Sequence, residues 1–188
     1  MSNTLTMSKQ ELVALAQRRL DEEVGASAWT MRQQLALTCR ILYDGGHDSG
    51  LAGQITCRAH NPGTFYTQQL GLGFDEISTS NLIEVDQDLQ VLSGKGIPNP
   101  ANRFHTWIYR QRPDVNCIIH THPTHVAALS MLEVPLAISH MDTCPLYDDC
   151  AFLESWPGVP VGNEEGEIIA NALGDKRAIL LALSLIHI

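Results

Sequence analysis

The sequence is poor in basic residues and lacks the features of several protein classes. Only 12 lysines and arginines stand against 21 acidic residues, which gives a formal net charge of -9 at pH 7. Proteins that bind nucleic acid or anionic membranes usually carry a basic patch, so we expect neither partner. No stretch approaches the roughly 18 consecutive apolar residues of a membrane span, and no basic then apolar leader opens the chain. These absences favour a soluble, cytoplasmic protein.

The cysteines lack the spacing of a disulfide framework. There are five of them, an odd number, and no two form a C-x-x-C motif. Such a set is typical of reduced, buried thiols, so we expect no disulfide. A chain of 188 residues can also bury roughly 70% of its unfolded surface, and it needs no covalent staples.

The strongest chemical signal is a histidine pair in the apolar stretch DVNCIIHTHP at residues 114–123. Side chains alternate faces along a strand, so His120 and His122 point the same way, with Cα atoms roughly 6.5 to 7 Å apart. The opposite face carries apolar residues that can enter a core: Val115, Cys117 and Ile119. Two imidazoles so placed can share one divalent ion. Two ligands do not make a site, however, and the pair also fits surface or hydrogen-bonded histidines.

Hydrophobic periodicity predicts a mixed α/β protein. Ser8 and Glu11 form a capping box, so we expect an N-terminal helical segment at residues 1–26, separate from a domain at 27–188. Further helices are predicted at residues 28–43, at 102–111, after a cap at Thr124, and from a cap at Asn163 to Gly174. Strands are predicted at residues 55–58, 64–67, 82–86, 89–92, 114–122, 136–139 and 178–182. The acidic stretch 143–162 is predicted to be a loop.

Four motifs, in this order and spacing, resemble the class II aldolase/adducin family. They are GQITCR at 53–58, GFDEISTSNL at 73–82, FHTWIYRQRPDV at 104–115 and IHTHP at 119–123. The resemblance covers nearly all of the chain from about residue 30 onward and is strongest to the adducin-related and uncharacterised branches of the aldolase II superfamily. It implies a three-layer α/β/α sandwich around a central, mostly antiparallel sheet, and a homo-oligomer, usually a tetramer.

The resemblance also implies a metal site. In the family's sugar-phosphate aldolases, an H-x-H pair and a later histidine hold a divalent ion. His120 and His122 match the pair, and zinc is the expected ion, with manganese or cobalt as alternatives. The later histidine follows a strand that matches residues 178–182, but this sequence has Leu183 and Ser184 there. We therefore expect the third ligand to be missing and metal binding to be impaired.

The last residues depart from the family altogether. The resemblance continues through Ala182 and then stops, so we expect a C-terminus that is truncated or foreign, and a domain that is incomplete. Residues 183–188 are apolar and would expose an aggregation-prone edge unless covered. His187 lies beyond the ligand motif and is predicted to be an ordinary tail residue.

Other aldolase positions are altered as well. The catalytic glutamate of the aldolases falls at Ala101, four residues before His105, and an alanine cannot move a proton. The phosphate-cradling positions fall at Gln54, Asn99 and Pro100 and do not match. We therefore expect no fuculose- or ribulose-phosphate substrate. The pattern leaves His105 with either a structural or a site role.

The resemblance implies two functions from different classes. The first is a metal-dependent carbonyl or lyase enzyme, in which the ion would polarise an oxygen of a small carbonyl substrate. Its general acid or base is not identified, and Asp142, Tyr147 and Asp148 are candidates because they lie in a polar loop. The alternative is a non-catalytic, adducin-like interaction domain of the actin cytoskeleton. The altered positions favour the alternative, and the intact histidine pair favours the enzyme.

Overall fold

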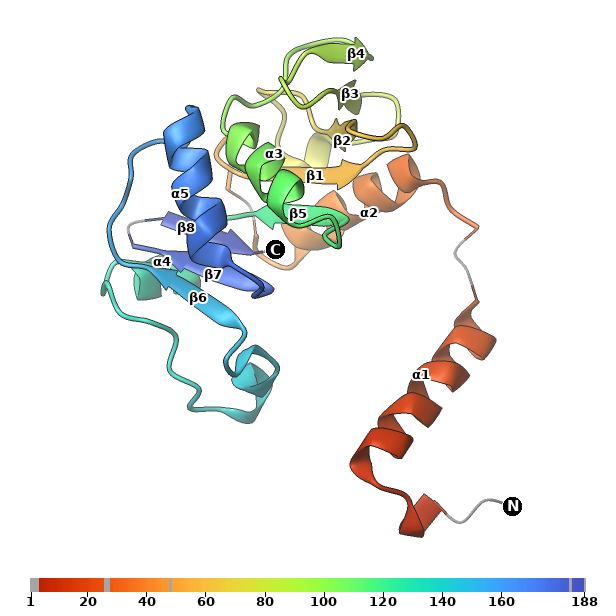
Figure 1. Ribbon diagram of the computed structural model, residues 1–188. Helices are drawn as coiled ribbons and strands as arrows, with labels where there is room; N and C mark the ends of the chain where they lie inside the picture. The colour runs from red at the N-terminus through yellow and green to blue at the C-terminus, as the bar shows by residue number, and fades with distance from the viewer. Residues whose placement is uncertain (1–3, 26–27, 48, 183, 188) are drawn as a thin grey trace. The chain divides into compact units, whose positions relative to one another are not determined.

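The computed structural model describes residues 4–25, 28–47, 49–182 and 184–187 (Figure 1). The chain divides into two compact units, Met1–Thr30 and Met31–Ile188. The first unit holds a 3-10 turn, η1 (Thr4–Thr6), and helix α1 (Lys9–Val24). The predicted capping box is present, because Ser8 N donates to Glu11 Oε2 at 2.7 Å and Glu11 N donates to Ser8 Oγ at 3.3 Å. None of the described helices combines the length and apolarity that a membrane crossing needs.

The second unit is built on one sheet. In the described residues the strand order is β4-β3-β2-β1-β5-β8-β7-β6. The strands are β1 (Gln54–Arg58), β2 (Phe65–Thr67), β3 (Ile83–Val85), β4 (Val91–Ser93), β5 (Cys117–His120), β6 (Cys150–Leu153), β7 (Ala178–Leu181) and β8 (Ser184–His187). Among these described strands, only β6 and β7 pair in parallel, and the other neighbours are antiparallel. The predicted mostly antiparallel sheet is confirmed.

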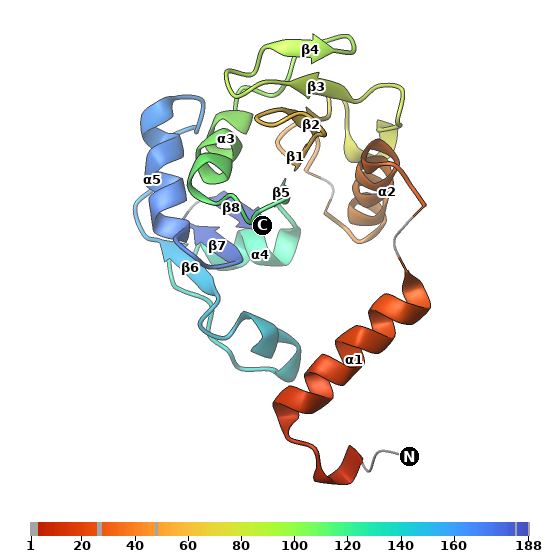
Figure 2. The same ribbon diagram turned by 45° about the vertical axis from the view of Figure 1, so that its right-hand side comes forward.

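Helices cover both faces of this sheet (Figure 2). Its helices are α2 (Met31–Asp44), α3 (Asn102–Gln111), α4 (Thr124–Ser130) and α5 (Asn163–Leu173), with the 3-10 turns η2 (Phe74–Glu76) and η3 (Met141–Leu146). On one face, Phe104 of α3 and Ile169 of α5 share a core with Ile118 and Ile179 of the sheet. On the other face, α2 packs against β1 and η2 in a second core. The chain therefore forms the predicted α/β/α sandwich.

Strand β5 alternates between these two cores. Ile118 packs into the core beneath α3, whereas Cys117 and Ile119 pack against the core beneath α2. This is the predicted period of two. The prediction was wrong for Val115, which packs on the α3 side, because the strand begins only at Cys117, after the turn that follows α3.

The region after β5 differs from the prediction in three places. Residues 136–139 form no strand, since they have no pairing partner among the described residues. Strand β6 lies instead inside the predicted loop, where it pairs with β7. Neither predicted cap makes its hydrogen bond, because Pro123 and Gly162 hold the N-cap positions and Thr124 and Asn163 are the first helical residues.

The C-terminal tail also differs from the prediction. Residues Ser184–His187 form β8, which pairs with β5 on one side and β7 on the other. This segment is therefore inside the sheet and does not expose the predicted free edge. Leu183 and the side chains of residues 184–187 lie outside the described part of the structure, and so does the predicted role of His187.

The cysteines are all free thiols. Cys39 and Cys57 are buried, Cys117 and Cys150 are half-buried, and Cys144 is exposed. Burial raises the pKa of the Cys39 and Cys57 thiols to about 12, so both are held in the protonated form. Buried, protonated thiols behave as small apolar side chains.

Gly166 allows α5 to lie close to α3. A Cβ at this position would lie 2.5 Å from Trp107 Cδ1, and the indole is held by a 3.2 Å hydrogen bond from its Nε1 to Asn163 Oδ1. We expect Gly166→Ala to lower the free energy of unfolding by about 1–3 kcal/mol, because overpacking outweighs alanine's better helix propensity. Urea unfolding would measure this, with the exposed Glu167→Ala on the same helix as a control expected to stay within about 0.5 kcal/mol. An unchanged or more stable Gly166→Ala variant would contradict the packing argument.

Candidate functional site

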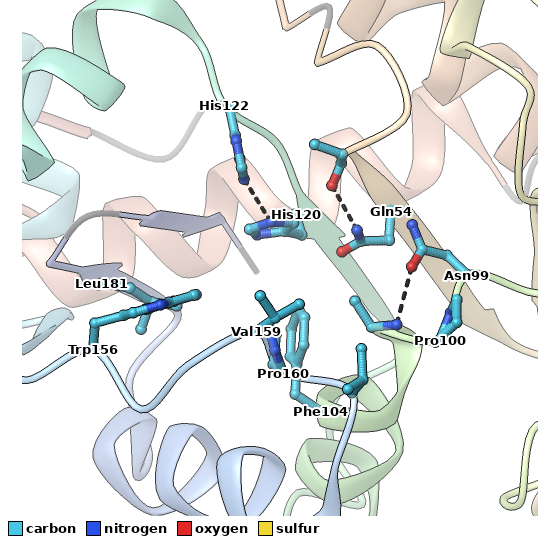
Figure 3. Close-up of a pocket in the computed structure, with 13 residues that line it drawn as sticks. Gln54, Asn99, Pro100, Phe104, His120, His122, Trp156, Val159, Pro160 and Leu181 are labelled. Atoms are coloured by element: carbon cyan, nitrogen blue, oxygen red, sulfur yellow. Dashed lines mark hydrogen bonds between the residues drawn. The ribbon is translucent and has the colours of Figure 1, made fainter.

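The two predicted ligands, His120 and His122, meet at the end of β5. Their Nε2 atoms are 2.8 Å apart, and the rings meet edge to face with centroids 4.7 Å apart (Figure 3). His120 is the last residue of β5 and is buried, whereas His122 is half-buried. The H-x-H spacing thus brings both imidazoles to one point, as predicted.

Burial favours the neutral form of both imidazoles. Desolvation lowers the pKa of His120 well below its usual value, with smaller contributions from His122 and His105. Burial also lowers the pKa of His122. Neutral imidazole is the form that binds a metal, so little proton competition is expected near neutral pH.

The donor chemistry of the pair suits a divalent ion, but the number of ligands is small. Two nitrogens bound to tetrahedral zinc at 2.0–2.1 Å lie about 3.3 Å apart. The Nε2 atoms of His120 and His122, at 2.8 Å, would therefore need to separate slightly. Within the described residues, no group of three or more His, Cys, Asp or Glu side chains is placed to hold a metal. Leu183, at the expected position of a third ligand, lies outside those residues.

The histidine pair lines a cavity of about 370 Å³. The walls come from β1, the start of α3, the end of β7 and the segment between β6 and α5 (Figure 3). The apolar residues that line it include Phe104, Trp156, Val159, Pro160, Val161 and Leu181. A cavity of this volume falls in the range of small-molecule sites, about 300–1,000 Å³.

The altered family positions lie around the same cavity. Gln54, Asn99, Pro100 and Ala101 all line it together with the histidines. Sequence reasoning had located these residues only as departures from the aldolases. These four positions contribute two amide side chains and two small apolar side chains to the cavity lining.

Sequence reasoning missed the wall between β6 and α5. Trp156 and residues 159–161 fall in the stretch predicted to be a structural loop, and they line the cavity. The available signal was the tryptophan itself, because a large aromatic residue among turn residues needs an apolar contact. Leu181, in a predicted core strand, gave no signal of its own.

The three acid/base candidates lie elsewhere. Asp142, Tyr147 and Asp148, which were candidates only because they lie in a polar loop, do not line the cavity in the described structure. Asp148 pairs with Lys176 at 3.1 Å, and Tyr147 is 75% exposed. The reason is strand β6, which directs the preceding acidic turn toward the start of β7.

His105 has a structural position. It is fully buried on α3, its Nδ1 lies 2.8 Å from Thr56 Oγ1, and it does not line the cavity. Its ring packs edge to face against Phe104, which in turn packs against His120. His105 therefore supports the wall behind the histidine pair and does not touch the cavity.

Burial of His105 predicts a loss of stability in acid. Desolvation lowers the pKa of His105 from 6.5 to about 3, so between these pH values the unfolded chain binds a proton that the folded chain excludes. The contribution of His105 to folding is complete above pH 6.5 and is lost as the pH falls, by up to about 1.4 kcal/mol per pH unit. Urea unfolding at pH 7.5 and 5.5 should show this loss of unfolding free energy, and His105→Gln should make the loss smaller. The control is His125→Gln, at an exposed position on α4, which should lose as much unfolding free energy between the two pH values as the wild type. Equal losses in the two variants would contradict the assignment to His105.

Comparison with known proteins agrees with this architecture. The family model "Class II Aldolase and Adducin N-terminal domain" matches residues 33–183. The decarboxylase NovR of Streptomyces niveus is 32% identical over 140 residues, which cover 73% of this chain and 52% of that protein. Adducin-related protein 1 of Caenorhabditis elegans is 28% identical over 181 residues, covering 90% of this chain and 24% of that protein.

A solved structure shows the same fold. The L-fuculose 1-phosphate aldolase from Glaciozyma antarctica PI12 superposes with a TM-score of 0.75 at 33% identity, covering 83% of this chain and 61% of that one. The chain spans 50% to 60% of the length of the first curated relatives that it matches. Since the family model covers most of the sequence and the fold agrees, the chain belongs to the class II aldolase and adducin family.

Proposed function

We propose that this protein is a divalent-metal-dependent lyase that acts on a small carbonyl compound, with His120 and His122 as the metal ligands. The observation that carries the proposal is the convergence of two Nε2 atoms, 2.8 Å apart, on one wall of a cavity large enough for a substrate. Two similar proteins, a decarboxylase and an aldolase, belong by name to the carbon–carbon lyases, and this similarity supports the class.

Each group of cavity residues has a separate proposed role. His120 and His122 would hold zinc, or manganese or cobalt, through neutral imidazoles. The bound ion would supply Lewis acidity toward a substrate carbonyl oxygen and the negative charge that develops on it. Phe104 and Trp156 would exclude water from the reacting end of the substrate. Two protein ligands are fewer than the three of most catalytic zinc sites, so we propose weak metal binding and impaired activity for this chain.

The remaining parts of the proposal concern assembly and location. We propose that residues 27–188 form the functional domain, that they assemble as a homo-oligomer, a tetramer in the family, and that the protein acts in the cytoplasm. We propose neither nucleic acid nor a membrane as a partner.

The alternative is a non-catalytic, adducin-like interaction domain that would act in the actin cytoskeleton. One observation favours it: Ala101 occupies the cavity wall where the aldolases carry their catalytic glutamate. The similarity to adducin-related protein 1 extends over 90% of the chain and supports it too.

Metal content distinguishes the two functions. The protein would be purified without a chelator or a histidine tag, and its zinc, manganese and cobalt would be measured by mass spectrometry before and after incubation with each ion. Uptake of one ion per chain supports the lyase. A folded protein that takes up no ion supports the interaction domain.

A further inference from the structure

The cavity beside the histidines leaves apolar surface open to solvent. Val159 is 67% exposed and Val161 is 53% exposed, although both line the cavity. They line the cavity together with Phe104, Trp156 and Leu181, and Figure 3 shows Val159 beside Phe104. Exposed valines that line a concave, aromatic wall gain free energy when an apolar ligand removes them from water.

The amide of Gln54 makes the electrostatic potential on the polar side of the cavity negative. Gln54 Nε2 donates to the carbonyl oxygen of Ala52 at 2.5 Å, and a carbonyl can only accept, so the orientation of the amide is fixed. Its oxygen, Oε1, faces the side of His120 (Figure 3) and has no hydrogen-bond partner among the described residues. Gln54 is only 3% exposed, so this negative end of the amide dipole lies in a poorly solvated place. It opposes an anion in the cavity and favours a neutral or hydrogen-donating group.

The second amide of the cavity, that of Asn99, is also bonded to the backbone of the cavity wall. Asn99 Oδ1 accepts from Ala101 N at 3.0 Å, and Asn99 Nδ2 donates to the carbonyl oxygen of Leu51 at 3.3 Å. Both polar atoms of Asn99 are therefore committed to the backbone. The amides of Gln54 and Asn99 thus each bond to the backbone of the cavity wall, and no lysine or arginine is among the described residues that line the cavity and could neutralise a phosphate.

We propose that the cavity binds an unphosphorylated aromatic ketone or aldehyde, whose ring packs against Trp156 and the valine wall. A single substituted ring fits within about 370 Å³ and covers Val159 and Val161. This inference deepens the proposed function and rests on it for one point only, that the carbonyl group lies toward His120 and His122. The preference for an aromatic body follows from the apolar wall and the preference for an uncharged one from Gln54, so both can be tested in protein without metal.

The test compares three probes by isothermal titration calorimetry, in protein stripped with a chelator and in protein incubated with Co²⁺. They are 4-hydroxyacetophenone, dihydroxyacetone and dihydroxyacetone phosphate. We expect 4-hydroxyacetophenone to bind at least tenfold more tightly than either of the others in both preparations. Tighter binding of dihydroxyacetone phosphate, or equal binding of all three probes, would overturn the inference.

Two variants connect the binding to the wall. Trp156→Ala should weaken the binding of 4-hydroxyacetophenone about tenfold, whereas Trp156→Phe, which keeps an aromatic ring, should weaken it less than threefold. Val159→Ser changes an exposed residue that the fold does not need, and it should weaken binding about threefold. Unchanged binding in both Trp156→Ala and Val159→Ser would show that the apolar wall does not bind the ligand.

The outcomes separate this inference from the proposed function. If Co²⁺ does not bind but the aromatic ketone binds the stripped protein, the ligand class stands and the metal lyase fails. If Co²⁺ binds at the histidines but dihydroxyacetone phosphate is the preferred probe, the lyase stands and the ligand class fails.

Discussion

Replacing His122 with alanine should weaken the binding of Zn²⁺ or Co²⁺ by about 100-fold or more, and His120→Ala should do the same. Each substitution removes one of the two imidazoles whose Nε2 atoms converge at 2.8 Å in the described part of the chain. Changes in the residues that merely orient a ligand already cost about 10- to 100-fold in metal affinity, and loss of a ligand costs more. Competition with a chromophoric chelator would measure the affinity at constant pH.

The matched control for this experiment is His125→Ala. His125 lies on α4, is exposed, and does not line the cavity, so its loss should leave metal affinity within about twofold. His122 is the cleaner site for substitution, because it is half-buried, while His120→Ala also opens a space in a buried position. Full metal affinity in both His120→Ala and His122→Ala would mean that the ion binds elsewhere, and it would end the proposal for this pair.

The histidine pair could be predicted from the sequence because its geometry is local. A strand alternates its side chains, and the positions of Ile118 and Ile119 in opposite cores show that β5 obeys this rule. Helix α3 begins at Asn102 and ends at Gln111, as the apolar period predicts. The burial of His105 could not be predicted in the same way, since it depends on Thr56 and Phe104, which come from different elements.

The cavity could not be predicted, because its residues come together only through pairing between distant segments. Strand β6 is four residues long and lies next to acidic turn residues, so its local pattern is weak. It forms because Ala151 and Leu153 pair with Ile179 and Leu181 of β7. That pairing brings Trp156 and the segment after it to the histidines. The family resemblance had located Gln54 and Ala101 on the other wall, but only as residues that differ from an aldolase.

Arg58 joins three segments behind the histidine strand, and its loss should have the largest effect on stability. From the end of β1, its Nε donates to Val115 O at 2.7 Å, and its Nη2 donates to Tyr109 O at 2.9 Å and to Arg112 O at 3.1 Å. Two of these carbonyls belong to the C-terminal end of α3, where the helix dipole is negative and a cation is favoured. The guanidinium also lies over the Tyr109 ring, 4.6 Å from its centroid. Arg112 O also accepts from Val115 N at 3.1 Å, so the carbonyls of Tyr109 and Val115 depend most on Arg58.

Arg58→Met keeps most of the apolar stem and removes all three hydrogen bonds. We expect it to lower the free energy of unfolding by about 2–4 kcal/mol, since hydrogen bonds to a charged group are each worth about 1.5–3 kcal/mol and the carbonyls would be left partly unsatisfied. Arg58→Lys should lose less unfolding free energy, because one ammonium can reach some of the acceptors but cannot reproduce the forked geometry of the guanidinium.

The control is Arg110→Met, which removes an exposed guanidinium 5.3 Å from the Trp107 ring and should cost less than about 1 kcal/mol. Urea unfolding at pH 7.5 would rank the variants, and a loss for Arg58→Met no larger than that for Arg110→Met would show that solvent replaces the guanidinium at the end of α3. Because the segment that Arg58 holds leads directly into β5, a large loss would instead show that Arg58 stabilises the chain just before the strand that carries His120.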